Sequence, residues 1–497
     1  MAGGRVLSPF FGSSLYQWAS VIGVALLSYT VGYFYHVPLY RYGATPPLLA
    51  AALYTLLLPL WIVGALERFL ILPLLPSTLL CSFLTIGPPS LLWASLTPHL
   101  QQQTAGTSLH AGSVLGVSTL GSLAGVFIVA FYLVPFLGLS KTLLALGSLG
   151  GVTALLAATQ WQAATRAVVL LAAAAAVLVG LAAVPPILLG STLARFEMLS
   201  STSGVRSQLQ LVEAKETFYQ SYSLWTSGEG ASPTLHFFMD GLQQFEWNEA
   251  DDANAVPANP EYFHYAQRAF SWIPDPRHGH GLFIGLGGGL VPYLVQKQYP
   301  EARLQVVELD PDIASVVSRR LPLARLDRAA NRPEIVVDDG RNFLRSSRET
   351  YDYIFLDAYV GTYIPHHLST VEFFRLIRNH LNPGGVVVIN VLSLLDSNGF
   401  LDRMEATVHA ALPLTVPVDV PLSVNRVIFA FSEASRELPI DPASEMDKVT
   451  QTALAIHSTA RERDRAAQLA VFVDDRDDID ATLFEAQKKL FEFKRRL

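Results

Sequence analysis

Charged side chains are nearly absent from the first 194 residues, which hold only six of the chain's 35 Lys and Arg and 42 Asp and Glu residues. A water-facing domain of this length would carry about a quarter charged residues. The segment therefore lacks the surface of a soluble domain, and long apolar runs fill it instead. We expect residues 1–194 to form a multi-pass α-helical membrane domain in the lipid bilayer.

A helix that crosses a bilayer needs roughly 20 mainly apolar residues. We expect about six spans, at Leu15–Tyr35, Pro46–Ala65, Phe69–Leu96, Ala111–Leu137, Thr142–Thr159 and Ala167–Leu189. Lys and Arg beside these spans are more frequent on the side of the N-terminus, which predicts a cytoplasmic C-terminal part at an inner or plasma membrane. No charged residue lies convincingly in the middle of a span, which favours an anchor over a coupled transporter.

The rest of the chain changes pattern twice. Residues 195–260 are expected to form a small antiparallel β unit, with strands near Gln208–Ala214, Tyr219–Thr226 and Leu235–Met239. Residues 261–440 alternate strand and helix patterns, which predicts an α/β domain with a parallel sheet. Residues 441–497 are expected to be a charged, mostly helical tail with a solvated face.

The α/β pattern also fixes where a ligand would bind. Its expected strands are Gly281–Ile284, Leu304–Glu308, Glu334–Val337, Tyr353–Asp357, Val386–Val391 and an edge strand at Val424–Phe431. The segment Asn382–Gly385 predicts a Pro-Gly turn between a helix and a strand. In such open sheets, ligands bind beyond the carboxyl ends of the strands.

A glycine-rich loop follows the first of these strands. Gly285 and Gly287 let the backbone approach a ligand closely, and Glu308 lies about 20 residues further on, where an acid can accept hydrogen bonds from ribose hydroxyls. The glycine spacing differs from the dinucleotide pattern G-x-G-x-x-G, so a nucleoside without phosphates fits better. The alternative for Glu308 is a helix cap or a turn residue.

Acidic residues also end the third and fourth strands. Asp338 or Asp339, ahead of Gly340, can accept a hydrogen bond from an adenine amino group. Asp357 lies at the carboxyl edge, where it would face the reactive centre. Each of these acids has the same alternative as a cap or turn residue.

Several other functions are disfavoured by composition. The formal net charge of −7 argues against a nucleic-acid binder. The single cysteine, Cys81, excludes an intrachain disulfide and is expected to be a small buried residue. His366 and His367 are interpreted as loop residues rather than metal ligands or general bases, and no set of residues has convincing metal spacing.

Several motifs resemble the membrane-fused group of spermidine synthase-like proteins, a branch of the polyamine aminopropyltransferase family. The matching segments are ETFYQ at Glu216–Gln220, MDGLQQ at Met239–Gln244, Phe263–His264, and DAYVGTYIPHHLSTVEFF from Asp357. The N-terminal FGSSLYQWASVIGVALLSYTVG is similar to that group's membrane domain. The resemblance implies a Rossmann-like fold of the S-adenosylmethionine-dependent methyltransferase type.

The same resemblance implies a reaction and a set of site residues. The chain would move an aminopropyl group from decarboxylated S-adenosylmethionine, a co-substrate rather than a bound cofactor, to an amine such as putrescine. A homodimer is also implied. Asp357 would be catalytic, and the donor would be bound by Gln220, Gln244, His264, Gly285, Gly287, Glu308, Asp339 and Gly340.

The chain also departs from the family pattern where the family binds cations. Four family acids are replaced, at Gly288, Val360, Thr362 and Tyr265. Their loss should weaken binding of a di- or triamine, because each buried charge pair contributes on the order of a few kcal/mol. An S-adenosylmethionine-dependent methyltransferase and a non-catalytic sensor of nucleosides or polyamines therefore stay open as alternatives.

Overall fold

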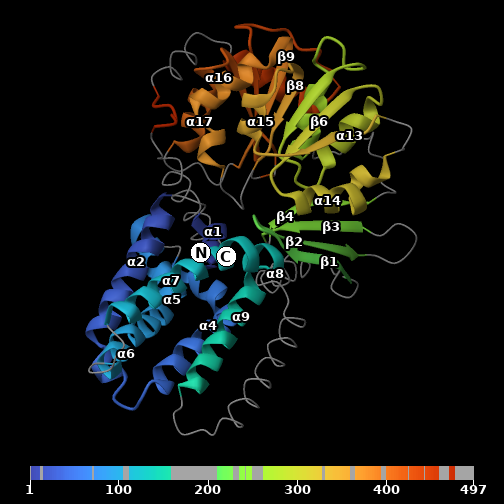
Figure 1. Cartoon of the computed structure of the whole chain (residues 1–497). Helices are drawn as coiled ribbons and strands as arrows, with labels where there is room; N and C mark the ends of the chain where they lie inside the picture. Colours follow the sequence, from blue (N-terminus) through green and yellow to red (C-terminus); the bar gives the residue numbers. More distant parts are fainter. Residues whose placement is uncertain are drawn as a thin grey trace. The chain divides into compact units, whose positions relative to one another are not determined.

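The computed structural model describes residues 2–11, 15–69, 72–104, 111–157, 210–227, 234–240, 242–248, 261–326, 331–358, 364–392, 399–421, 423, 425–441, 443–457 and 469–475 (Figure 1). The chain forms two compact units, and the division runs through a small four-stranded sheet. One unit comprises Met1–Ser207, Leu211–Ser223 and Met239–Leu242, and the other comprises Gln208–Gln210, Leu224–Phe238 and Gln243–Leu497.

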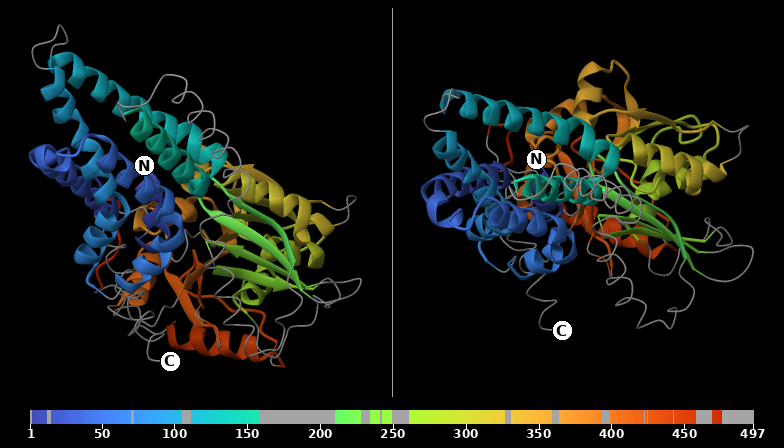
Figure 2. Two further views of the ribbon diagram at one scale, coloured as in Figure 1. Left: turned by 90° about the horizontal axis from the view of Figure 1, so that it is seen from below. Right: turned by 60° about the horizontal axis from the view of Figure 1, so that its bottom comes forward.

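The apolar N-terminal part is helical, as its composition predicts. Its elements are α1 (Ala2–Phe11), α2 (Leu15–Phe34), α3 (His36–Leu39), α4 (Thr45–Phe69), α5 (Leu74–Ala94), α6 (Leu96–Thr104), α7 (Ala111–Ile128), the π-helical turn η1 (Val129–Leu133), α8 (Val134–Leu137) and α9 (Leu139–Leu156). Helix α5 packs against α2 and α4, and α4 packs against α9 (Figure 2). Gly147 permits a close approach of α9 to α4, because a Cβ atom there would lie 2.8 Å from the backbone of Leu56.

Four stretches of these helices are long and apolar enough to cross a membrane: Thr45–Ile62, Leu74–Gln103, Gly112–Leu133 and Leu139–Leu156. The first expected span is the helix α2, although it is not one of these four. The third expected span, Phe69–Leu96, is interrupted near Pro73, where α4 has ended at Phe69 and α5 begins at Leu74, and α5 then continues through Pro88 and Pro89. The sixth expected span, Ala167–Leu189, lies outside the described residues.

The small sheet has one strand more than the sequence indicated. Its strands β1 (Gln210–Glu216), β2 (Ser221–Ser227), β3 (Thr234–Met239) and β4 (Leu242–Trp247) follow one another in that order. The β4 sequence LQQFEW contains three polar residues, so its strand pattern is weak. Glu216 at the end of β1 accepts hydrogen bonds from the amide and hydroxyl of Ser140, at 2.9 and 2.7 Å, where α9 begins.

The second unit contains the expected Rossmann-like domain. Its elements are α12 (Tyr262–Phe270), β5 (His280–Ile284), α13 (Leu290–Gln298), β6 (Arg303–Glu308), α14 (Pro311–Arg320), η2 (Pro322–Arg325), β7 (Glu334–Val337), α15 (Gly340–Ser346), β8 (Tyr351–Leu356), η3 (His366–Leu368), α16 (Val371–Asn379), β9 (Leu381–Leu392), α17 (Phe400–His409), β10 (Leu414–Asp419), β11 (Asn425–Phe431) and α18 (Glu445–His457). The strand order is β10-β11-β9-β8-β5-β6-β7. Strands β5 to β9 are parallel, and β11 and β10 are antiparallel, which is the mixed sheet of the methyltransferase type.

Two expectations for this sheet are wrong. Val424–Phe431 was expected at the edge, but β11 lies between β9 and β10, and its Val427–Phe431 side chains are buried. The strand at that edge is β10, which contains Pro417, a residue that an edge strand tolerates because one side of it needs no backbone donor. The expected turn at Asn382–Gly385 is a bulge inside β9, where Leu381 pairs with Tyr351 and Val386 pairs with Tyr353.

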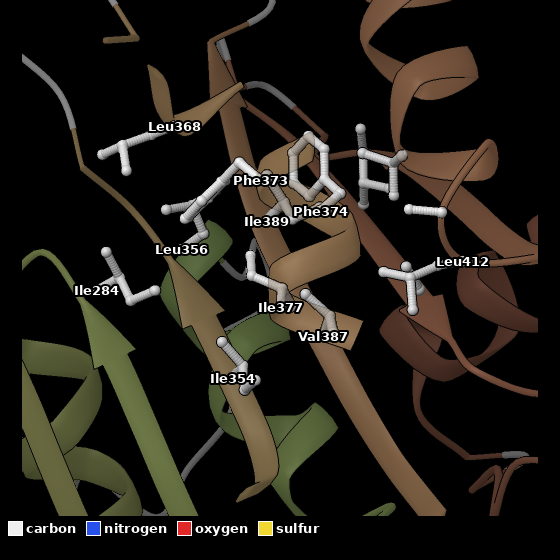
Figure 3. Close-up of a cluster of buried hydrophobic side chains, with 14 of the residues drawn as sticks. Ile284, Ile354, Leu356, Leu368, Phe373, Phe374, Ile377, Val387, Ile389 and Leu412 are labelled. Carbon is white, nitrogen blue, oxygen red and sulfur yellow. The ribbon is translucent and has the colours of Figure 1, made fainter. Parts of the chain in front are cut away.

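Helices cover both faces of this sheet, as its doubly wound order requires. On one face, Phe373, Phe374 and Ile377 of α16 pack over Ile354 of β8 and Ile389 of β9 (Figure 3). Helices α15 and α17 contribute further residues to this cluster. The alternate side chains of the strands point to the other face, where helix α12 covers them.

The C-terminal tail is not a uniformly solvated helix. Helix α18 ends at His457, and residues 469–475 are not helical. Phe472 is fully buried in the core cluster of the α/β domain. The sequence did not predict this contact, because one aromatic side chain beside a strongly charged segment makes it.

Candidate functional site

The candidate site lies at the topological switch point of the sheet. From β5 the chain winds through β6 to β7, and then crosses back to β8 and β9 on the other side of β5. In open α/β sheets, such a reversal opens a binding crevice beyond the carboxyl ends of the strands. Backbone hydrogen bonds fix these ends, since Asp357 N donates to Ile284 O at 2.9 Å and Gly285 N donates to Val307 O at 2.9 Å.

Gly285 and Gly287 have the positive φ angles that their sequence pattern suggested, at 94° and 51°. A Cβ atom on Gly285 would lie 2.3 Å from the carbonyl oxygen of Asp357, so only glycine fits this crossing of two strand ends. Among the described residues, no atom lies within 4 Å of the Cβ position of Gly287. The glycine loop therefore serves two purposes, close packing at Gly285 and open backbone at Gly287.

Glu308 ends β6 with its carboxylate turned onto the glycine loop. Its Oε2 atom accepts from Leu286 N at 3.0 Å and its Oε1 atom accepts from Asp310 N at 2.8 Å. The side chain is buried, and burial raises its pKa to about 7 despite these amide donors. Glu308 thus closes the loop of Gly285–Gly289 and lies where the ribose-binding role was expected.

Asp339 caps helix α15 with one carboxylate oxygen and makes a side-chain contact with the other. Its Oδ1 atom accepts from the amides of Arg341 and Asn342, both at 3.0 Å, at the start of α15. Its Oδ2 atom pairs with His367 Nε2 at 2.7 Å. Burial alone would raise the pKa of Asp339, but the His367 contact and the amides outweigh it and lower the pKa. Gly340 follows directly and packs on Ile284.

Asp357 follows β8 and is held by side chains from two other elements. Its Oδ2 atom accepts from the Tyr262 hydroxyl at 3.0 Å, and its Oδ1 atom accepts from Asn390 Nδ2 at 2.9 Å. Asn425 Nδ2 in turn donates to Asn390 Oδ1 at 2.9 Å, which orients that amide. Burial raises the pKa of Asp357, and the bonds from Asn390 and Tyr262 offset part of that rise.

Sequence reasoning missed Tyr262, Asn390 and the pairing of His367 with Asp339. The two residues that hold Asp357 come from helix α12 and strand β9, far from it in the chain. A polar residue inside the apolar run of β9 was the one available signal for Asn390. His367 had been interpreted as a loop residue, and it does lie in the short helix η3, although its ring reaches Asp339.

The remaining predicted donor residues are dispersed. His264 lies on α12, and burial lowers its pKa to about 4, so its ring is neutral at physiological pH. Gln244 lies on β4, and Gln220 lies between β1 and β2 in the other compact unit. The described part of the chain has no cluster of three or more His, Cys, Asp or Glu side chains that could hold a metal ion.

The positions that depart from the family pattern are apolar or aromatic where the structure describes them. A Cβ atom on Gly288 would lie 1.7 Å from the ring of Phe245, which fills the space beside the loop. Tyr265 is buried on α12, and its hydroxyl has no hydrogen-bond partner among the residues described. Val360 and Thr362 lie outside the described residues. An acidic side chain at position 288 would therefore require Phe245 to move.

Comparison with known proteins shows which family the α/β domain is similar to. Residues 274–420 match the model of the spermine/spermidine synthase domain. A probable polyamine aminopropyl transferase of Bifidobacterium longum is 31% identical over 199 residues, which cover 39% of this chain and 42% of that protein. A polyamine aminopropyltransferase of Vibrio vulnificus is 30% identical over 174 residues, covering 34% of this chain and 56% of that protein. The chain thus spans about half the length of these relatives.

Weaker similarities extend to methyltransferases and to solved structures. The human eEF1A lysine and N-terminal methyltransferase is 24% identical over 196 residues, covering 37% of this chain and 26% of that protein. A probable spermidine synthase from Corynebacterium glutamicum has a TM-score of 0.42 at 18% identity, covering 54% of this chain and 97% of that chain. The domain at residues 274–420 is therefore spermidine synthase-like in sequence, by its match to that family model and to these two relatives.

Proposed function

We propose that this chain is a membrane-anchored transferase that moves an aminopropyl group from decarboxylated S-adenosylmethionine to an amine. One observation carries the proposal: Asp357 lies at the switch point, in contact with the glycine loop, with Tyr262 and Asn390 holding its carboxylate. The family match over residues 274–420 supports the same reaction class. The acceptor would be a small amine such as putrescine.

The reaction is a displacement at the carbon beside a sulfonium. The nitrogen of the acceptor forms a bond to that carbon, the carbon–sulfur bond breaks, and its electron pair stays on sulfur as neutral methylthioadenosine. No strong acid is needed for this leaving group. The nitrogen must lose a proton, and Asp357 can accept it, because its raised pKa makes it a better base than an exposed aspartate. The proton would then pass to solvent.

The donor would be held by the other strand ends. Glu308 would accept hydrogen bonds from the ribose hydroxyls, and Asp339 would accept from the adenine amino group. His264, Gln244 and the open backbone at Gly287 would complete the donor site. Proximity and in-line orientation would contribute most of the rate, because the chemistry itself needs only one proton transfer.

The apolar N-terminal helices would anchor this site to a bilayer. Four described stretches are long and apolar enough to cross one. Their lack of charge near the middle of the spans supports an anchor rather than a coupled transporter. The soluble part would then face the cytoplasm.

Methyl transfer from S-adenosylmethionine is the second candidate, and Phe245 favours it. A transferred aminopropyl group carries an ammonium, which an acid would stabilise, whereas Gly288 and the ring of Phe245 provide none. Phe245 is buried, so an aromatic ring rather than a carboxylate fills the space beside Gly288. The nucleoside-binding residues would serve either donor.

Calorimetry on the detergent-purified chain separates these candidates. We expect decarboxylated S-adenosylmethionine and methylthioadenosine to bind, and S-adenosylmethionine to bind at least tenfold more weakly. A preference for S-adenosylmethionine would move the assignment to methyl transfer. If none of the three ligands binds, the chain keeps the fold of a transferase without its chemistry.

A further inference from the structure

Residues 469–475 are bound to the α/β domain by one buried ring and its backbone. Phe472 is fully buried, and the guanidinium of Arg403 lies 4.1 Å from the centre of its ring. Phe472 N donates to Thr407 Oγ1 at 3.0 Å, and Val371 N donates to Phe472 O at 2.9 Å. This segment is therefore a fixed part of the domain.

The buried ring places Asp474 against a buried arginine. Arg341 Nη1 donates to Asp474 Oδ1 at 2.7 Å and Nη2 donates to Oδ2 at 2.5 Å, in the two-pronged geometry of a strong ion pair. Thr370 Oγ1 also donates to Asp474 Oδ1 at 2.7 Å. The Arg341 hydrogen bonds lower the pKa of Asp474 to about 2, so the pair stays charged at any physiological pH.

Arg341 connects this segment to the candidate adenosyl site. It lies on α15, two residues after Asp339, and its Nη1 atom also donates to the backbone oxygen of His367 at 3.0 Å. The His367 ring then pairs with Asp339 Oδ2 at 2.7 Å. The neighbouring His366 ring contacts Val473 O at 3.2 Å, which ties the same short helix to the C-terminal segment a second time.

We propose that Asp474 and Arg341 are positioning residues of the adenosyl site, which hold His367 against Asp339 so that this acid can select an adenine base. The proposal rests on the proposed function. Asp339 commits Oδ1 to two backbone amides, so only the Oδ2 side remains to meet a ligand, and His367 sets its environment. Without Asp474, the buried guanidinium loses its counter-ion and the anchor on His367 is released.

The test compares two nucleosides that differ only in the base. Methylthioadenosine carries the 6-amino group, and methylthioinosine carries a carbonyl instead. We expect the unaltered protein to prefer methylthioadenosine, and Asp474→Asn to weaken that ligand by roughly 2- to 30-fold while barely changing methylthioinosine binding. A general structural role for Asp474 would weaken both nucleosides equally, so the ratio between them is the decisive readout.

Two further variants test the route and the specificity of the effect. Asp475→Asn, which alters the adjacent exposed acid, should leave the ratio unchanged. If the effect passes through His367, Asp474→Asn should cause no further loss in a His367→Ala background. An unchanged ratio in Asp474→Asn, or full additivity with His367→Ala, would overturn the inference and leave the proposed function standing. If the unaltered protein binds neither nucleoside, the proposed function fails, and the inference fails with it.

Discussion

Two carboxylates at the same edge of the sheet are held in different ways. Glu308 after β6 accepts hydrogen bonds from the backbone amides of Leu286 and Asp310. Asp357 after β8 accepts from the side chains of Tyr262 and Asn390. Backbone donors remain when nearby side chains change, whereas side-chain donors can be altered one at a time. With the proposed roles, this contrast would give a fixed binding group at Glu308 and an adjustable base at Asp357.

Both carboxylates are partly or fully buried, and burial raises the pKa of each. For Glu308 the pKa reaches about 7, so its charge changes near neutral pH. For Asp357 the rise strengthens a base.

Removing the charge of Asp357 should have the largest effect on turnover. Asp357→Asn keeps the shape of the side chain but cannot accept a proton, so we expect kcat to fall by about 10³-fold. The dissociation constant of the donor should change less than threefold, because other strand ends hold the nucleoside. Single-turnover kinetics with calorimetry measures both quantities. As a control, Asp352→Asn alters an acid at the opposite end of β8. Normal turnover by Asp357→Asn would exclude Asp357 as the base.

Glu308, the other carboxylate, should contribute to the pH dependence of stability near neutral pH. Glu308 has a folded-state pKa of about 7, above its ordinary value of 4.5, so the folded state holds its proton more tightly than the unfolded state. Its contribution is complete below pH 4.5 and is lost as the pH rises through 7, by on the order of 3 kcal/mol. Thermal unfolding in detergent at pH 5 and pH 8 should show a smaller difference for Glu308→Gln than for the unaltered protein. Equal differences would mean that Glu308 titrates normally.

The same substitution should weaken nucleoside binding more modestly. Glu308→Gln removes a charged acceptor for the ribose hydroxyls, so we expect binding of methylthioadenosine to weaken by roughly 10- to 100-fold. Calorimetry against Glu334→Gln, an exposed acid at the start of β7, provides the control. If Glu308→Gln binds the nucleoside normally, the ribose lies elsewhere.

The sequence predicted the elements whose signals are local. The bounds of β7 agree with expectation, because β7 is a short apolar run. The start of α14 has a local signal too, since Asp310 caps it and Pro311 begins it. The strand-end acids could also be located, since each follows an apolar run directly. Position along the chain was therefore enough to find Glu308, Asp339 and Asp357.

The partners of those acids could not be predicted in the same way. Tyr262 lies 95 residues from Asp357, and Asp474 lies 133 residues from Arg341. Such contacts depend on how helices and strands pack, and a short stretch of sequence does not indicate that packing. Phe245 illustrates the same limit, because only the folded chain places its ring against Gly288. The sequence indicated that an acid is missing there, but not what fills its space.

Removing the hydrogen bond from Tyr262 to Asp357 should have the smallest effect. The Tyr262 hydroxyl lowers the pKa of Asp357, so Tyr262→Phe should raise that pKa further, by up to about one pH unit. Since the base must be unprotonated, the acid limb of the kcat profile should move to higher pH, while kcat on the plateau stays within a few-fold. Tyr265→Phe is a matched control on the same helix, because the Tyr265 hydroxyl contacts no acceptor or donor among the described residues. If the acid limb of Tyr262→Phe has the same midpoint as that of the unaltered protein, the Tyr262 hydroxyl does not set the pKa of Asp357.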